Sequence, residues 1–295
     1  MQILKSTRPL SVVCVLGLWL ISTAGNCSRA RVESMTKMNE GVAYAQSGRW
    51  AEAAQALEHA GALDPTNSQA YYNLAMAQLE LQKPGAARDA LQKAIAASPE
   101  VAAYHEKLGY VLSRLDPPDY EGAMRAFQEA IDREPTLFRA YFQRARILEK
   151  QGKYQQALEE YTRGIQAGPR FVEAYAELGR LYADLGYTRE AALVLTEGIR
   201  VAIPNTEEEA HLHYLLGTIY QESMNYQGAI EEYRAALRIV PSMADVLFSL
   251  GWCYAEIDER DEAKRYLRRF IEAAGPETPA HIKQAAQNKI SQLGG

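Results

Sequence analysis

The chain has 295 residues, of which 47% are hydrophobic and 23% are charged, and its formal net charge is −5 at pH 7. This composition is ordinary for a soluble globular protein. An acidic chain without a basic stripe argues against nucleic acid as the main partner.

The first 26 residues have the layout of a secretory signal. A positively charged start, "MQILKSTRP", precedes a twelve-residue apolar core, "LSVVCVLGLWLI", and "STAGNCS" follows. The apolar core is too short for a comfortable membrane span. We therefore expect residues 1–26 to direct export, and residues 27–33 to form a short N-terminal tether.

The segment contains two alternative cleavage sites. Ser22, Thr23 and Ala24 present small residues to a general signal peptidase, which would cut after Ala24. The alternative is "AGNC", which resembles a bacterial lipobox and would make Cys27 the lipidated first residue. In that resemblance Asn26 stands where a small residue is usual. An uncleaved anchor is the third possibility, and lipidation of Cys27 is the expectation that we carry forward.

From residue 34 to residue 276 the sequence repeats itself, with prolines closing the units. Two of the intervals between these prolines are 34 residues, 65 to 99 and 135 to 169. Each unit has a small residue in its first half, at Gly41, Ala75, Gly109, Ala145, Gly179, Gly217 and Gly251. An alanine follows at Ala53, Ala87, Ala123, Ala157, Ala191, Ala229 and Ala263, and a large residue stands four positions later at Leu57, Leu91, Phe127, Tyr161, Leu195, Tyr233 and Leu267. A fixed period of this length is typical of stacked repeats.

Between the turn residues, apolar side chains recur at helical spacing, and strand-like alternation is absent. Gly-containing turns such as "QSGRW", "KQGKY" and "DLGYT" precede the second helix of a unit. The units resemble the tetratricopeptide repeat. This resemblance implies an all-α, right-handed superhelical solenoid of seven helix-turn-helix repeats over residues 34–276, in which each repeat buries its apolar face against its neighbours. Residues 277–295 would form a C-terminal capping helix.

Three units depart from the repeat pattern late in their second helices. Gly164, Gly198 and Phe270 stand where the family usually has alanine. We expect less regular packing at these three junctions.

The cysteine count agrees with lipidation. Cys14 would leave with the signal, and Cys27 and Cys253 stand at opposite ends of the repeats. A disulfide needs Cα atoms within about 7 Å, which an extended stack does not provide. Cys253 is expected to be a buried small apolar residue, so Cys27 would stay unpaired in an oxidising compartment unless it were acylated.

The motifs of catalysis and metal binding are missing from the sequence. His211 and His213 are two residues apart on a predicted helix and therefore point to different faces, whereas a helical metal pair needs a spacing near four. The acidic run Glu207–Glu209 fits an exposed helix N-terminus that is favoured by the helix dipole. We predict no catalytic residue, no metal or other cofactor and no small-molecule substrate, and hence a protein that is not an enzyme.

The resemblance also implies a binding surface, because the first helices of this family line a concave groove. The residues expected to contact a partner there are Tyr72, Asn73, Tyr110, Arg139, Phe142, Arg146, Arg180, Tyr214, Phe248 and Trp252. Tyrosine, tryptophan and arginine commonly anchor interfaces. The arginines suit a partner segment with carboxylates or a free C-terminus, with Phe142 supplying apolar contact. The alternative is that the arginines pair with Glu149, Glu173 or Glu177 of neighbouring helices.

These expectations describe an exported bacterial repeat lipoprotein, periplasmic and tethered to the outer membrane. It would be a scaffold that binds peptide segments or helices of protein partners. The chain also resembles outer-membrane pilotins, and this resemblance implies that it assists the assembly of a secretin, pilus, secretion or motility complex. The alternative is an adaptor that docks or regulates peptidoglycan-modifying enzymes. A cytosolic co-chaperone is less favoured, because Met38 and Val42 stand where the co-chaperone clamp has lysine and asparagine.

Overall fold

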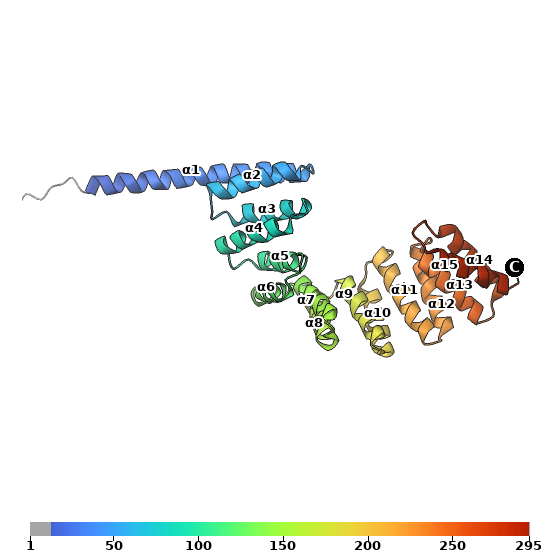
Figure 1. Ribbon diagram of the computed structural model, residues 1–295. Helices are drawn as coiled ribbons and strands as arrows, with labels where there is room; N and C mark the ends of the chain where they lie inside the picture. Colours follow the sequence, from blue (N-terminus) through green and yellow to red (C-terminus); the bar gives the residue numbers. More distant parts are fainter. Residues whose placement is uncertain (1–12, 295) are drawn as a thin grey trace, which may run out of the picture. The chain divides into compact units, whose positions relative to one another are not determined.

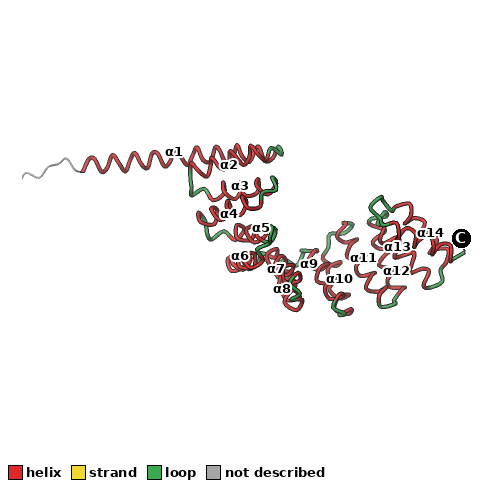
Figure 2. Tube along the Cα trace, viewed as in Figure 1, coloured by secondary structure: helices red, strands yellow, loops and turns green. Residues whose placement is uncertain are grey.

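The computed structural model describes the backbone of residues 13–294 and the side chains of residues 29–294 (Figure 1). Over this range the chain forms fifteen α-helices and no strand (Figure 2). Residues 1–12 of the expected signal lie outside the described residues, and so does the side chain of Cys27. Its lipidation and the cleavage site therefore remain predictions. None of the helices described is both long and apolar enough to span a membrane.

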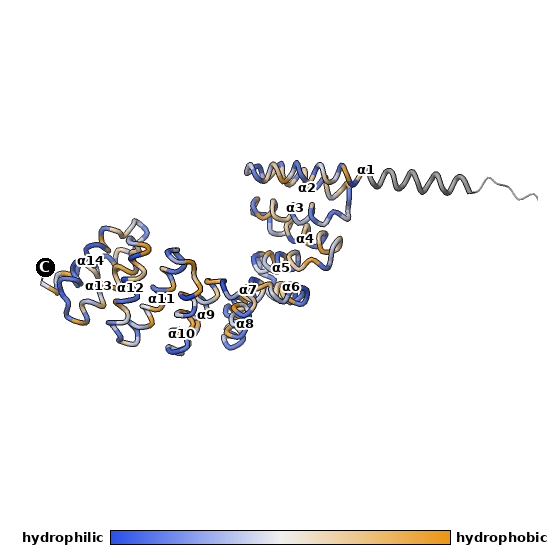
Figure 3. Tube along the Cα trace, turned by 180° about the vertical axis from the view of Figure 1, so that it is seen from behind, coloured by the Kyte–Doolittle hydropathy of each residue, from blue (hydrophilic) through white to orange (hydrophobic). Residues whose placement is uncertain are grey.

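The helices fall into two units, Met1–Glu134 and Pro135–Gly295, which are described separately. The first unit contains three helix pairs: α1 (Val13–Gln46) with α2 (Trp50–Leu63), α3 (Ser68–Glu80) with α4 (Pro84–Ala97), and α5 (Ala102–Leu112) with α6 (Tyr120–Arg133). The second unit contains four pairs and a final helix: α7 (Phe138–Lys150) with α8 (Tyr154–Ala167), α9 (Val172–Asp184) with α10 (Thr188–Val201), α11 (Glu207–Glu222) with α12 (Tyr226–Ile239), α13 (Ala244–Glu256) with α14 (Arg260–Ala273), and α15 (Ala280–Gln292). Hydrophobic and hydrophilic stretches are mixed along the helices of each unit, as expected for helices that bury one face (Figure 3).

The segment expected as a tether, residues 27–33, lies inside α1, which continues without a break from Val13 to Gln46. The helix is anchored just after this segment by Ser34, whose side chain is fully buried. The Ser34 hydroxyl donates to the carbonyl oxygen of Ala60 over 2.8 Å and accepts from the amide of Asn67 over 2.9 Å. The tether is therefore a helical extension of the first repeat.

One contact recurs inside the helix pairs, in which a large side chain of the second helix lies against a small residue of the first. A methyl group added at Gly179 would lie 2.6 Å from the Leu195 side chain, and one at Gly217 would lie 2.6 Å from the Tyr233 ring. The seven large residues expected at this position, Leu57, Leu91, Phe127, Tyr161, Leu195, Tyr233 and Leu267, are all at most 1% exposed. The helix pairing expected from the repeat is confirmed.

The three departures from the repeat pattern pack differently from one another. A methyl group at Gly164 would meet its nearest neighbour at 3.5 Å, an ordinary contact distance, whereas one at Gly198 would lie 2.8 Å from Cβ of Tyr175. Phe270 is 1% exposed and its ring lies 5.1 Å from that of Phe248. The three junctions therefore differ from one another: Tyr175 fills the space at Gly198, the Phe270 ring itself fills it in the last repeat, and an alanine would fit at Gly164.

Cys253 is buried, as expected, and its thiol donates to Oε1 of Gln221 over 3.4 Å. Burial raises the pKa of this thiol to about 12, because the thiolate would lose its hydration. The residue acts as a small apolar part of the core.

C-terminal to the last repeat, α15 packs against α14. Its Ala286 is fully buried in the same apolar cluster as Leu267 and Phe270. This helix covers the end of the stack, where a repeat would otherwise expose the apolar face that its neighbour buries.

The substitution Ala157→Leu tests the helix register. Ala157 of α8 is 0% exposed, so three added carbons would overpack the junction and lower the free energy of unfolding by about 1–3 kcal/mol. Urea unfolding followed by circular dichroism measures the effect. The control is Ala103→Leu on an exposed position of α5, which should change stability by less than about 0.5 kcal/mol. Equal effects of the two substitutions would contradict the register.

Candidate partner-binding surface

The first helices of the second unit, α7, α9, α11 and α13, turn one face away from their second helices, and we call this the first-helix face. It carries Arg139, Arg146, Glu177, Arg180, His211, Thr218 and Asp245, all exposed or half-buried. Between α9 and α11 it is hollowed by a groove of about 300 Å³, whose lining includes Arg180, Asp184 and Glu222. A partner segment could therefore meet both side chains and a recess on this face.

Arg139 and Arg146 are both exposed and stand seven residues apart, two turns along α7. The Arg139 guanidinium carbon lies 5.4 Å from the centre of the Phe138 ring, and that of Arg146 lies 5.9 Å from the centre of the Phe142 ring. Among the described residues neither arginine forms an ion pair. Both guanidinium groups thus keep their hydrogen-bond donors available to a carboxylate from outside the chain.

Arg180 has the same repeat position as Arg146 but a different environment. Its guanidinium donates to Glu177 over 2.9 Å, to Asp184 over 2.7 Å and also to Glu149 of α7. The alternative expectation, pairing with glutamates of neighbouring helices, is met by Arg180 and not by Arg139 or Arg146. Arg180 therefore joins α7 to α9.

The Arg180 pairs continue into the core through Tyr161. The Tyr161 hydroxyl donates to Glu149 over 3.1 Å, and burial together with the charges of Glu149 and Glu177 raises the pKa of this phenol. For Arg180, burial alone would lower the pKa, but the hydrogen bonds to Glu149 and Glu177 outweigh burial and raise it. The Tyr161 phenol and the Arg180 guanidinium therefore both keep their protons at ordinary pH.

Phe142 was expected to contact a partner, and the structure corrects this. Its side chain is only 8% exposed. The ring packs edge-on against Tyr161, with ring centres 5.6 Å apart, and against Phe171 at 5.0 Å. Phe142 turns toward α8 and the next repeat, because its aromatic surface is better buried in the core than left beside water.

The aromatic residues expected farther along the unit are half-buried among their own neighbours. Tyr214 lies 6.1 Å from Tyr233, ring centre to ring centre, and burial raises the pKa of its phenol. Phe248 packs on Phe270. The indole of Trp252 lies under Lys289 of α15, with Nζ 4.5 Å from the ring centre, so the capping helix covers part of a residue that was expected to face a partner.

Tyr72, Asn73 and Tyr110 belong to the first unit and are half-buried there. Tyr72 stacks on Tyr104 with ring centres 5.2 Å apart, and the amide oxygen of Asn73 accepts from Gln69 over 3.2 Å. Two cations lie near the Tyr110 ring, Arg114 at 4.5 Å and Lys107 at 5.3 Å from its centre. Nothing in these contacts tests their expected partner role, which stays a prediction.

The different environments of Arg146 and Arg180 predict different effects on stability. Arg180→Ala leaves the half-buried Glu149 without its cation and should lower the free energy of unfolding by about 1 kcal/mol, near the upper end for a partly exposed pair. Arg146→Ala, at the equivalent position of the preceding repeat, should change it by less than about 0.5 kcal/mol. Chemical denaturation of the two variants gives the comparison, and a larger loss for Arg146→Ala would show that the pairing described is wrong.

Models of the tetratricopeptide repeat match residues 44–109, 126–159, 176–244 and 245–274. A search of curated protein sequences gives no match.

Solved structures give the same fold at low sequence identity. The C-terminal part of a repeat-containing protein from Cytophaga hutchinsonii aligns with a TM-score of 0.68 and 16% identity, covering 86% of this chain and 99% of that one. PilW, described as a widely conserved type IV pilus biogenesis factor, gives 0.56 and 22%, covering 70% and 94%. YrrB, described as a protein with an unusual peptide-binding site, gives 0.54 and 19%, covering 68% and 99%. The repeated helix pairs and the sequence matches over most of the chain show that this protein belongs to the tetratricopeptide repeat family.

Proposed function

We propose that the protein is a non-enzymatic scaffold that binds a segment of a partner protein on the first-helix face of its second unit. The observation that carries this proposal is the pair Arg139 and Arg146, two exposed guanidinium groups on one face of α7. Each has an aromatic ring beside it and no carboxylate of the described chain bound to it. A partner carboxylate, from an acidic side chain or a free C-terminus, would form charge-assisted hydrogen bonds with them.

The family supports a protein partner. Tetratricopeptide repeats are interaction modules, and the structural neighbour YrrB is described as having a peptide-binding site. A stack of helix pairs offers a long surface of this kind, because each repeat contributes its first helix to the same side.

We further propose that the protein works in the bacterial cell envelope, assisting assembly of a secretin, pilus, secretion or motility complex. The signal layout of residues 1–26 and the "AGNC" sequence support export and lipidation. The structural neighbour PilW is described as a type IV pilus biogenesis factor, which is consistent with this role. Docking of a peptidoglycan-modifying enzyme is the competing assignment, and the identity of the captured partner separates the two.

The charge-reversing double substitution Arg139→Glu with Arg146→Glu tests the binding surface. Capture of the partner from membranes should fall by at least tenfold, since two attractions become two repulsions. Helix content and melting temperature should stay near wild type, because both residues are exposed and lack ion pairs. Affinity capture followed by mass spectrometry measures the loss and identifies the partner.

The matched control reverses Arg189 and Arg268, which are exposed on the second helices α10 and α14. It makes the same change in net charge away from the first-helix face, so capture should persist. Equal loss in both double variants would point to net charge alone, and retained capture in the first would remove Arg139 and Arg146 from the site.

Cys27→Ala tests the membrane tether. If Cys27 is acylated, the variant should move from the membrane fraction to the soluble fraction, because the lipid supplies the anchor. Fractionation and intact mass of the mature wild-type chain provide the measurement. A wild-type chain that begins at Gly25, or that is already soluble, would show that lipidation does not occur.

A further inference from the structure

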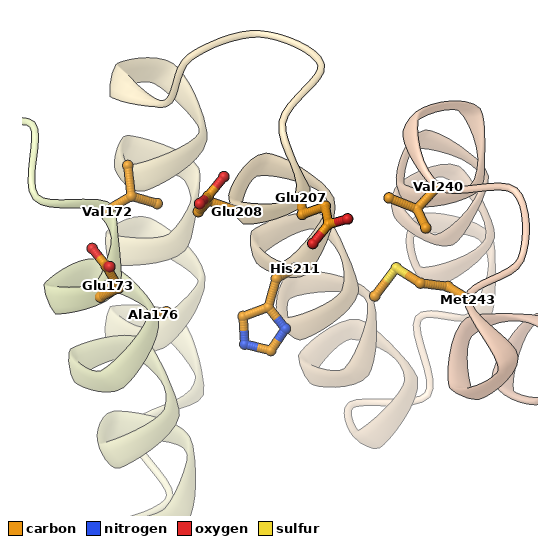
Figure 4. A pocket seen from close by; sticks show the side chains of 8 residues that line it. All are labelled: Val172, Glu173, Ala176, Glu207, Glu208, His211, Val240 and Met243. Atoms are coloured by element: carbon orange, nitrogen blue, oxygen red, sulfur yellow. The ribbon is translucent and has the colours of Figure 1, made fainter. Parts of the chain in front are cut away.

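A hollow of about 490 Å³ opens in the second unit where α9 and α11 begin (Figure 4). It is lined by Val172, Glu173 and Ala176 of α9, by Glu207, Glu208 and His211 of α11, and by Val240 and Met243 of the connection between α12 and α13. We call it the acidic hollow. Its volume lies within the range of about 300–1,000 Å³ that is usual for ligand sites.

The acidic hollow depends on an irregularity of the repeat. In α9 and α13 the helix begins at Val172 and Ala244, but α11 begins at Glu207, three residues before the equivalent Ala210. The long connection before α11 thus adds a turn of helix that α9 and α13 lack. Glu207 and Glu208 stand on this extra turn.

Two contacts hold the extra turn in place. The Thr206 hydroxyl caps α11 by accepting from the backbone N–H of Glu209 over 3.3 Å, and the Glu209 carboxylate accepts from the N–H of Asn205 over 2.6 Å. Asn205 takes a φ of 63°, which asparagine tolerates better than most residues. Glu209 is thereby committed to the cap, and Glu207 and Glu208 are not.

The hollow has an apolar floor and an acidic rim. Val172, Ala176, Val240 and Met243 are half-buried, whereas Glu173, Glu207 and Glu208 are exposed. Figure 4 shows Glu173 and Glu208 on the α9 side and Glu207 between α11 and Val240. Within the described part of the chain no cation pairs with any of these three carboxylates, so the rim has an unbalanced negative charge.

Charge complementarity selects the occupant. Three carboxylates repel an acidic or C-terminal segment, which is the partner chemistry that suits Arg139 and Arg146. An arginine or lysine has an aliphatic stem that packs on apolar side chains and a charged head that stays at the polar edge. The aliphatic stem matches the apolar floor of the hollow, and the charged head matches its acidic rim.

We propose that the acidic hollow binds a basic side chain of a partner segment. The stem lies against Val172, Ala176 and Met243, and the head pairs with carboxylates of the rim. The inference rests on the proposed function only in that the partner is a protein. Because the charge of the acidic hollow is opposite to that of Arg139 and Arg146, the hollow binds a different part of that partner.

The test uses the full chain and three peptides of sequence Gly-Leu-X-Leu-Gly, with blocked ends and X as arginine, citrulline or glutamate. Citrulline keeps the shape of arginine without its charge. Titrations by calorimetry or by nuclear magnetic resonance give the affinities. The arginine peptide should bind about tenfold more tightly than the citrulline peptide, as expected for a charge-assisted hydrogen bond, and the glutamate peptide should not bind.

Two variants separate the rim from the floor. Replacing all three rim glutamates, Glu173, Glu207 and Glu208, by glutamine should abolish the preference for arginine over citrulline. The same change at Glu159, Glu231 and Glu272, three exposed glutamates of α8, α12 and α14, should preserve it. Ala176→Leu fills part of the hollow and should weaken both the arginine and the citrulline peptide with the preference intact. Melting curves of all variants check that the fold is kept.

Equal binding of the arginine and citrulline peptides to the wild-type chain would overturn the proposal, and so would no measurable binding at millimolar peptide. An arginine preference that survives the replacement of all three rim glutamates would place the site elsewhere and overturn it as well. The variant Arg139→Glu with Arg146→Glu should keep the arginine preference. Suppose that Arg139→Glu with Arg146→Glu loses partner capture and that the wild-type chain shows no preference for the arginine peptide. The proposed function would then still hold, and only the proposal for the acidic hollow would be wrong.

Discussion

The contact between a large side chain of one helix and a small residue of its partner determines the rest of this structure. Leu195 and Tyr233 are fully buried against Gly179 and Gly217 of the preceding helices, where an added methyl group would lie 2.6 Å from the larger side chain. This contact determines which face of each first helix packs against the second helix. The opposite face is left for other residues, and in the second unit it carries the charged side chains that the proposed function uses.

Much of this arrangement could be predicted from the sequence, because small and large residues recur at a fixed period. The period does not show what each side chain meets from another repeat. Arg146 and Arg180 have equivalent positions, yet only Arg180 is reached by Glu149, which stands 31 residues earlier. Phe142 could not be distinguished from a groove residue, because helical spacing places it beside Arg139 and Arg146, and only the rings of Tyr161 and Phe171 draw it inward.

Turns and ends were harder to predict than helix faces, for physical reasons. The turns at Gly152 and Gly186 take a positive φ, and glycine is the expected residue there. The equivalent turns at Gln82, Met224 and Asp258 take φ values of 55–60° without glycine. Backbone hydrogen bonds that close each helix end, from the N–H of the following residue to a carbonyl of the last helical turn, hold this conformation. Near the C-terminus, Lys289 lies over Trp252, which stands 37 positions earlier. The repeat pattern of the sequence could not predict this contact.

Irregularities are where a periodic protein can acquire a property that its repeats do not share. From the repeat period alone, residues 203–210 are predicted to be a longer connection, and their glutamates to lie at an exposed helix N-terminus. In the structure the same insertion places Glu207 and Glu208 beside an apolar floor contributed by α9 and the α12–α13 connection. Each repeat packs only on its neighbours, so this local change leaves Arg139 and Arg146 of α7 unaltered. One stack of helices can therefore hold two regions of opposite charge, and a partner that satisfies both must carry an acidic and a basic group in a set order along its chain.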